Sequence, residues 1–181
     1  MDVLQRLAPV SASYATLPIA DAFNWPEAGS QLGDGEWYLV AFRSIRRLGA
    51  DEERLAEYDE AAHQEAAAST GFVHYFKGPA ATDGSCLSFC LWSSRAEARA
   101  AAGQADHVRA VSLLDEMYES YTLEFQRVTR AGGGPLAFEP YDRVPTAHVA
   151  HPAASRTVAA TRPGRGGRRS AGLPSEPSLP A

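Results

Sequence analysis

The sequence predicts an α+β domain of the ferredoxin-like class, in which a four-stranded antiparallel sheet carries two helices on one face. Three observations support this prediction. Residues 70–94 contain two apolar runs separated by Gly-Pro and Asp-Gly pairs, which is typical of a β-hairpin. A segment with helical periodicity stands on each side of the hairpin, and a further strand lies beyond each segment. The resulting β-α-β-β-α-β order is that of a ferredoxin-like domain.

The first half of the domain begins at residues 36–46, where the run E-W-Y-L-V-A-F-R-S-I-R is rich in aromatic and β-branched residues. Its nearly continuous apolar character predicts a strand in the middle of the sheet with both faces covered. Asp51 can cap the helix that follows, and the acidic residues after it suit the positive end of the helix dipole. This helix is expected to end near residue 68, before Gly71.

The second half of the domain starts with Ser94 and Glu97, which match the S-x-x-E capping box and predict a helix soon after Trp92. Gly103 interrupts this helix, so we expect it to be bent or split. Residues 121–129 alternate between apolar and polar side chains. This period of two predicts the strand that closes the series.

Two segments flank the predicted domain at 36–130. Residues 1–35 hold isolated apolar residues without sustained periodicity, and we expect them to form an arm that lies on the domain. Residues 131–181 are rich in Gly, Pro, Ser, Ala and Arg, with R-P-G-R-G-G-R-R at 162–169. This composition predicts a tail that is mostly disordered, from about residue 145.

The composition, with 45% hydrophobic and 22% charged residues, is that of a soluble globular protein. No apolar run approaches the roughly 20 residues that span a bilayer, and the N-terminus lacks a secretory pattern, so we predict a cytoplasmic protein without membrane insertion. Cys86 and Cys90 would lie about 13 Å apart on one strand, too far for a disulfide. Acidic residues concentrate before residue 130, which disfavours nucleic-acid binding by the core domain.

With both helices on one face of the sheet, the other face needs a cover. The strand near residues 86–92 separates an apolar row from a mixed row that contains Ser88, Cys90 and Trp92. We assign the apolar rows to the helix-packed face and the mixed rows to the other face, where they would line a cavity. This second face is expected to pair with a second copy in a homodimer, although a ligand or the N-terminal arm could also cover it.

His74 is the candidate catalytic residue of this cavity, because an imidazole among aromatic side chains can act as a general base on a phenol or an enolisable ketone. The alternative is a histidine that only makes a hydrogen bond within the sheet. An error of one residue in register would leave Tyr75 in its place. The candidate substrate-binding residues are Trp37, Arg43, Ser88, Cys90, Trp92, Glu124 and Gln126.

Other polar residues are interpreted as structural. Arg43 could bind an anionic substrate, but an ion pair with Glu124 is the stronger alternative. Asp59 and His63 stand four residues apart on the first helix and could share a metal, yet the sequence places no third ligand, so no metal is predicted. His107 is expected to be a core or interface histidine. The sequence also lacks G-x-G-x-x-G and P-loop motifs, so no nucleotide cofactor is expected.

Residues 36–130 resemble the dimeric α/β-barrel superfamily, and within it the antibiotic biosynthesis monooxygenase-like domains. The element order carries this resemblance, together with S-T-G-F before the second strand and L-W-S-S-R-A-E-A at the start of the second helix, with His107 downstream. The superfamily includes cofactor-independent oxygenases of aromatic polyketides, haem-degrading enzymes and proteins without known chemistry. The Asn-Trp-His set of the haem-degrading branch has no counterpart here, because the sole asparagine, Asn24, lies in the arm.

The resemblance implies a homodimer that binds a small aromatic or polyketide-like molecule without a cofactor. If the protein is an enzyme, we expect cofactor-independent oxygenation or proton transfer, because the fold alone does not fix the reaction. The alternative is a non-catalytic binding or assembly protein that uses the sheet face only for dimerisation.

Overall fold

A five-stranded antiparallel sheet forms the centre of the computed structural model, which describes residues 4–141. The predicted disorder beyond about residue 145, like the arginine-rich run, lies outside these residues. The strand order is β2-β3-β1-β4-β5. The bounds of the strands are β1 Gly35–Arg46, β2 Phe72–Phe76, β3 Ser85–Trp92, β4 Tyr118–Arg130 and β5 Ala137–Pro140.

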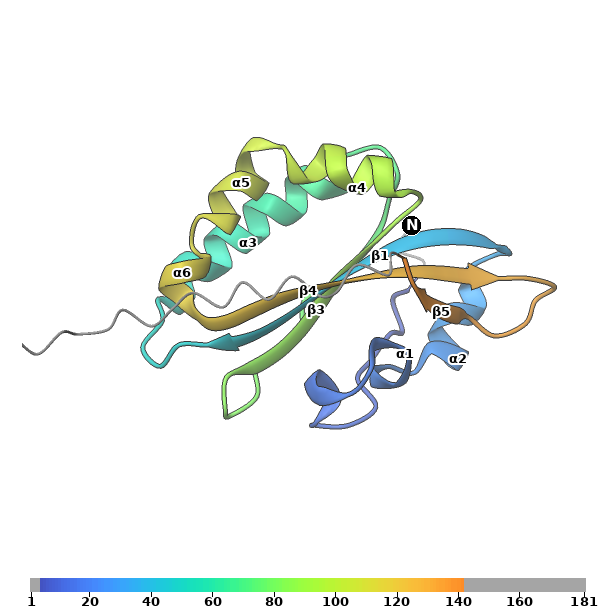
Figure 1. Ribbon diagram of the computed structural model, residues 1–181, viewed down its shortest axis with the longest axis horizontal. Coiled ribbons are helices and arrows are strands. Elements are labelled where there is room, and N and C mark those ends of the chain that lie inside the picture. The colour runs from blue at the N-terminus through green and yellow to red at the C-terminus, as the bar shows by residue number, and fades with distance from the viewer. Residues whose placement is uncertain (1–3, 142–181) are drawn as a thin grey trace, which may run out of the picture. The chain divides into compact units, whose positions relative to one another are not determined.

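Four helices pack on one face of this sheet (Figure 1). Their bounds are α3 Glu52–Ala67, α4 Arg95–Ala102, α5 Ala105–Val111 and α6 Leu114–Met117. The Asp51 carboxylate accepts a hydrogen bond from the backbone N–H of Arg54 at the start of α3, and Ser94 caps α4 in the same way through Glu97. The second predicted helix is split into three pieces, with Gly103 at the end of α4. The ferredoxin-like class is therefore confirmed.

The fifth strand, β5, lies in the segment predicted to be a tail. Gly132 and Gly133 take positive φ angles of 59° and 67°, which suit glycine in a tight turn between β4 and β5. The carboxylate of Asp34 accepts hydrogen bonds from both glycine N–H groups, at 2.8 and 2.9 Å. The turn sends the chain back along β4, where Phe138 packs against the ring of Trp25 at 5.0 Å. The predicted four-stranded sheet thus gains an edge strand.

The N-terminal segment, residues 4–32, packs on the face of the sheet opposite to α3–α6 (Figure 1). Its short helices are η1 Tyr14–Thr16, α1 Ile19–Ala22, α2 Trp25–Ala28 and η2 Gly29–Gln31. Phe23 lies at the centre of this layer, with its ring 4.8 Å from the ring of Phe76 and 5.3 Å from that of Phe89. The N-terminal segment and this face of the sheet therefore form one core.

Two arginines of the sheet hold the N-terminal segment through its backbone carbonyls. The guanidinium of Arg43 donates to the carbonyl oxygen of Leu17 at 2.6 Å and also to that of Ala15. Arg130 donates to the carbonyl oxygens of Gly29 and Ser30, both at 3.0 Å. Several charge-assisted hydrogen bonds at two places fix the position of a segment that has little regular structure of its own.

The predicted assignment of rows to faces is wrong for β3, whereas the mixed row of β4 does lie on the face away from the helices, where it pairs with buried residues of β1. Leu87, Phe89 and Leu91 lie on the face that the N-terminal segment covers, and each is at most 1% exposed. The mixed row with Cys90 and Trp92 faces the helices instead, since Trp92 packs with alanines of α4. Alternation shows which residues share a face, but the layer that covers this face depends on the apolar side chains that residues 4–32 supply.

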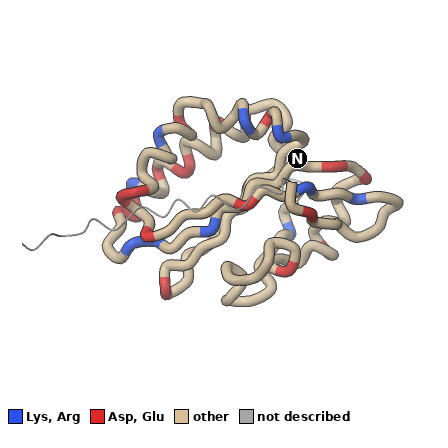
Figure 2. Tube along the Cα trace, in the orientation of Figure 1, with Lys and Arg blue, Asp and Glu red and all other residues tan. Residues whose placement is uncertain are grey.

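Charged residues are distributed over the helices, strands and loops of the described part of the chain (Figure 2). Acidic residues predominate along α3, whose single arginine, Arg54, pairs with Glu116 of α6 at 2.8 Å. Within residues 4–141, no helix is long and apolar enough to cross a membrane.

Candidate functional site

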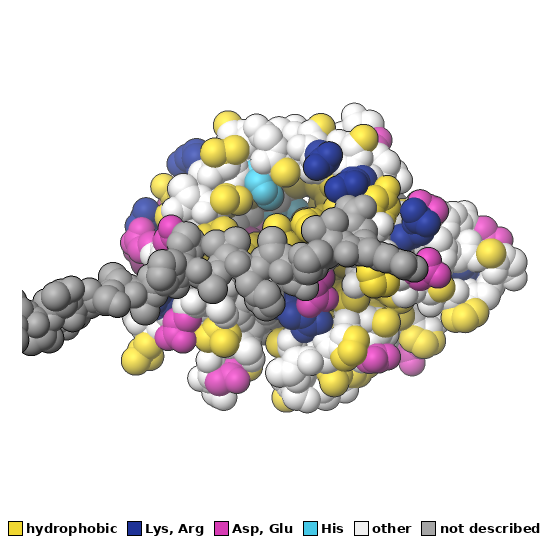
Figure 3. Space-filling model, viewed as in Figure 1, with side chains coloured by type: hydrophobic (Ala, Val, Ile, Leu, Met, Phe, Trp, Pro, Cys, Tyr) yellow, Lys and Arg dark blue, Asp and Glu magenta, His cyan; other side chains and the backbone are white. Residues whose placement is uncertain are grey.

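A hollow separates the helices from the middle of the sheet (Figure 3). Although α3 covers the sheet, none of its sixteen residues is buried, and the same is true of α5. The sheet side chains below them also keep accessible surface, and Phe125 is 40% exposed. We call this space the helix–sheet hollow, and the residues that define it are Val40, Phe42, Tyr75, Cys90, Tyr121, Leu123 and Phe125 from the sheet and Asp59 and His63 from α3.

The register of the strands places these sheet residues on one face. Val40 pairs with Cys90 on one side and with Phe125 on the other, and Cys90 pairs with Tyr75. Directly paired residues of antiparallel strands point to the same face. Val40 and Cys90 also pack against the cluster formed by Trp92 and the alanines of α4, so this is the face toward the helices.

A polar cluster joins α3 to β2 at one side of the hollow. The Tyr75 hydroxyl donates a hydrogen bond to Asp59 Oδ1 at 2.6 Å, and the other oxygen of that carboxylate pairs with Lys77 Nζ at 2.7 Å. The imidazole of His63 lies one helical turn from Asp59 and 4.9 Å from the ring of Tyr75, measured between centroids. Phe72 lies on its other side at 6.0 Å. His63 forms no hydrogen bond with any of the residues that the structure describes.

Protein atoms surround the hollow closely, although a water molecule can still reach its side chains. Desolvation, and after it the negative charge of Asp59, raises the pKa of Tyr75 well above its usual value. Desolvation likewise raises the pKa of Tyr121, whose ring lies 6.3 Å from that of Phe42. The pKa of the Cys90 thiol rises to about 12, mainly through desolvation. Both phenols and the thiol therefore stay protonated near neutral pH, and Cys90 is not an activated nucleophile.

The structure divides the predicted site residues between the two faces of the sheet. His74 lies on the face toward the N-terminal segment, 7% exposed, with its ring 5.9 Å from that of Phe89. Trp37 packs at the border of the same core, and Gln126 shares this face because it pairs with Leu39. The predicted cavity on this face is wrong, because side chains of residues 4–32 fill the space.

Arg43 and Glu124 form the ion pair that the sequence analysis considered, and the remaining N–H groups of Arg43 donate to the N-terminal segment. On the helix-facing side, Ser88 accepts a hydrogen bond from the Gly78 N–H at 3.0 Å and thereby supports the loop after β2. Trp92 is buried, with its ring 5.4 Å from that of Phe72. Of these predicted residues, Cys90 lines the helix–sheet hollow.

Sequence reasoning missed four polar or aromatic residues of the hollow as a group: Asp59, His63, Tyr75 and Tyr121. Two signals pointed to them separately. The spacing of Asp59 and His63 placed both on one side of a helix, and Tyr75 was the alternative to His74 in register. Within the described residues, no group of three or more His, Cys, Asp and Glu side chains could hold a metal ion.

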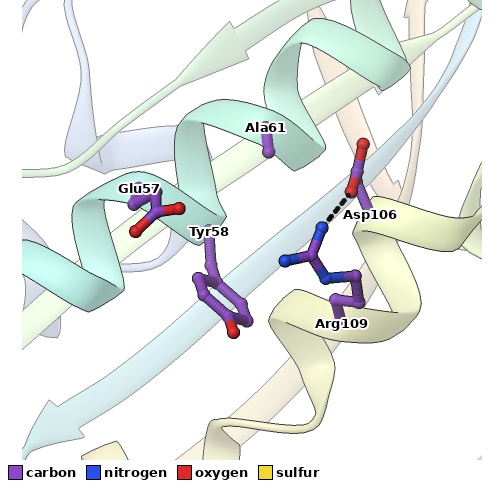
Figure 4. A pocket seen from close by; sticks show the side chains of 5 residues that line it. All are labelled: Glu57, Tyr58, Ala61, Asp106 and Arg109. Carbon is purple, nitrogen blue, oxygen red and sulfur yellow. Dashed lines mark hydrogen bonds and ion pairs between the residues drawn. The ribbon is translucent and has the colours of Figure 1, made fainter.

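A small cavity lies on the surface between α3 and α5 (Figure 4). It measures about 30 Å³, and Tyr58 and Arg109 line it with Glu57, Ala61 and Asp106. The guanidinium of Arg109 lies 5.0 Å from the Tyr58 ring and pairs with Asp106 at 3.0 Å. Such a volume has room for about one or two water molecules. This cavity is a contact between helices rather than a ligand site.

The fold and the hollow together define a ferredoxin-like domain with an aromatic space between its helices and its sheet. The chain belongs to the PB2B2.08-like family, whose model matches residues 1–139. This match includes the N-terminal segment as well as the sheet and the helices. A search of curated proteins finds no match.

Three solved structures that are similar to this chain cover about half of it. SnoaB, a cofactor-independent oxygenase from Streptomyces nogalater, is 17% identical over 55% of this chain and 95% of its own, with a TM-score of 0.41. NE2512, a protein of unknown function from Nitrosomonas europaea, gives the same identity and coverage and a TM-score of 0.46. A dimeric ferredoxin-like protein of unknown function from Thermobifida fusca is 15% identical over 50% of this chain and 90% of its own, with a TM-score of 0.42.

Proposed function

We propose that this protein binds a small aromatic or polyketide-like molecule in the helix–sheet hollow. The observation that carries the proposal is the contrast between the two faces of the sheet. The face under the N-terminal segment is filled, whereas aromatic side chains on the face toward the helices keep accessible surface. Exposed apolar surface inside a domain is costly unless a ligand covers it. Aromatic walls with a few polar groups are typical of small-molecule sites.

His63 is the best-placed base for proton-transfer or monooxygenase-like chemistry in this hollow. Its imidazole lies beside Tyr75 and makes no hydrogen bond within residues 4–141, so its nitrogens are available to a ligand. A neutral imidazole can take a proton from a phenol or from the carbon next to a ketone, and it can return the proton afterwards. The proton loss leaves an electron-rich anion on the ligand. His74, the base predicted from the sequence, lies on the opposite face of the sheet.

Exchange of an enolisable proton tests this assignment. We expect the full chain to accelerate deuterium incorporation at the carbon between the ring and the carbonyl of 2-tetralone, measured by proton NMR in D₂O at pD 7. His63→Ala is expected to lose this acceleration by about a hundredfold, within the range that a positioned base supplies. His74→Ala is the matched control and should keep the acceleration, provided that circular dichroism shows it to be folded. If His74→Ala lost the exchange and His63→Ala kept it, the base would be His74, on the face of the sheet under the N-terminal segment.

The second candidate function, a non-catalytic protein that uses the sheet face only for dimerisation, has less support. Residues 4–32 occupy that face, and its central side chains, among them Leu39, Ala41 and Phe89, are fully buried without a second copy. The homodimer implied by the resemblance would therefore need either another surface or displacement of this segment.

Sedimentation velocity tests whether the N-terminal segment keeps the helix-free face of the sheet from pairing with a second copy. A variant that lacks residues 1–32 exposes the apolar side chains of the helix-free face, so we expect it to self-associate at micromolar concentration. The full chain is expected to show no association through this face, and substitution of the exposed Val10 by aspartate should leave its sedimentation coefficient unchanged. A truncated chain that sediments as a folded monomer would show that the segment is not needed to cover the face.

A further inference from the structure

We infer that Tyr75 makes the helix–sheet hollow selective for ligands that donate a hydrogen bond from a hydroxyl or N–H group. This inference rests on the proposed function, because it concerns the same site. Tyr75 belongs to β2, and its hydroxyl points toward Asp59 of α3.

The single proton of the Tyr75 hydroxyl is already used. The hydroxyl donates to Asp59 Oδ1 at 2.6 Å, which is the short distance expected for a hydroxyl that donates to a carboxylate. Lys77 Nζ holds the other oxygen of that carboxylate at 2.7 Å, so the acceptor has a second fixed contact. A phenol has one proton to donate and two lone pairs that accept. The oxygen of Tyr75 can therefore offer a ligand only a lone pair.

The phenol also remains neutral, because desolvation and the charge of Asp59 both raise its pKa. A neutral oxygen whose proton is committed attracts a donor and repels the oxygen of a carbonyl or a carboxylate. Because Lys77 balances the charge of Asp59, the discrimination comes from the committed proton of Tyr75 rather than from net charge.

Tyr121 provides the contrast within the same hollow. Its hydroxyl makes no hydrogen bond with any of the described residues, so it can rotate and either donate or accept. A group of this kind adapts to the ligand and does not discriminate between donors and acceptors. The two tyrosines therefore form a matched pair, in which only the proton of Tyr75 is held by an acid.

The test compares two probes of similar shape, 2-naphthol and 2-fluoronaphthalene, by equilibrium dialysis at pH 7. The second probe replaces the hydroxyl by a group that cannot donate. We expect the preference for 2-naphthol, taken as the ratio of the two dissociation constants, to fall about five- to tenfold in Tyr75→Phe, the effect of one hydrogen bond. Tyr121→Phe should change this ratio by less than about twofold. An unchanged ratio in Tyr75→Phe would overturn the inference.

A second variant tests the commitment of the proton itself. Asp59→Ala frees the Tyr75 hydroxyl to donate, so 2-acetonaphthone, which only accepts, is expected to bind more tightly to this variant than to the wild type, by about five- to tenfold. Equal or weaker binding would contradict the role of Asp59. If none of the three probes binds to the wild-type chain, the proposed function itself fails. If all bind and the ratios do not respond to either variant, the hollow is a ligand site without this selectivity.

Discussion

Phe23→Ala is expected to destabilise the protein by about 3–5 kcal/mol, the cost of removing a large aromatic side chain from a packed core. The side chain is 2% exposed, and its ring contacts four others, those of Tyr14, Trp25, Phe76 and Phe89. Two of these rings belong to the N-terminal segment and two to the sheet. The substitution therefore opens a cavity at the centre of the layer that joins them, and little of it can close by local relaxation.

Urea unfolding followed by tryptophan fluorescence and by circular dichroism measures this loss. The matched control is Val10→Ala in the same segment, where the side chain is 53% exposed and the free energy of unfolding should change by less than about 0.5 kcal/mol. If residues 4–32 were only an arm resting on an independently stable domain, Phe23→Ala would leave the unfolding of the sheet unchanged. A single shifted transition for both probes would show that the segment and the sheet unfold together.

The order and the type of the main elements could be predicted because the local signals agree with the tertiary structure. The continuous apolar run of β1 predicted a strand in the middle of the sheet. In the structure β1 pairs with β3 along one edge and with β4 along the other. Asp51 and Ser94 cap the helices that they were expected to cap. Gly103 marks the first break of the second helix, where the chain leaves α4.

The N-terminal layer could not be predicted in the same way, because its helices are too short to show a period. Helices α1 and α2 have four residues each; Pro18 directly precedes α1, and Pro26 is the second residue of α2. A helix of one turn gains little from its own hydrogen bonds, so its stability comes from contacts with the sheet. The sequence shows the apolar residues that make these contacts but not the surface that receives them.

The site was missed for a related physical reason. Strand alternation separates Phe89 from Cys90, and it does so correctly, but both faces of this sheet need an apolar cover. The N-terminal segment buries the middle of one face, whereas α3 covers the other face while none of its own residues is buried. The depth of packing under each layer depends on side chains that are distant in the sequence. His63 and Tyr75 are brought together only by the distance between α3 and the sheet.

Arg43→Met is the second substitution for which we expect a large effect, a loss of about 2–4 kcal/mol in the free energy of unfolding. Methionine keeps much of the apolar stem but removes every N–H group. The carboxylate of Glu124, whose side chain is 27% exposed, then lacks its partner, and the carbonyl oxygens of Ala15 and Leu17 lose their donors. Removing one member of a fully buried pair costs about 3–5 kcal/mol, and the partial exposure of this pair reduces that cost.

A double-mutant cycle with Glu124→Gln separates the ion pair from the contacts with the N-terminal segment. If the unpaired carboxylate causes much of the loss, Arg43→Met with Glu124→Gln will be more stable than the sum of the two single changes predicts. The loss of unfolding free energy that remains after this correction measures the contacts with the two carbonyl oxygens. It should be accompanied by faster hydrogen exchange of the backbone amides at residues 14–17. Arg109→Met removes an exposed pair with Asp106 and a contact with the Tyr58 ring, and it should lower the free energy of unfolding by no more than about 1 kcal/mol. A wild-type exchange pattern in Arg43→Met would mean that apolar packing alone holds the segment, and Phe23 would then carry the attachment without the arginine.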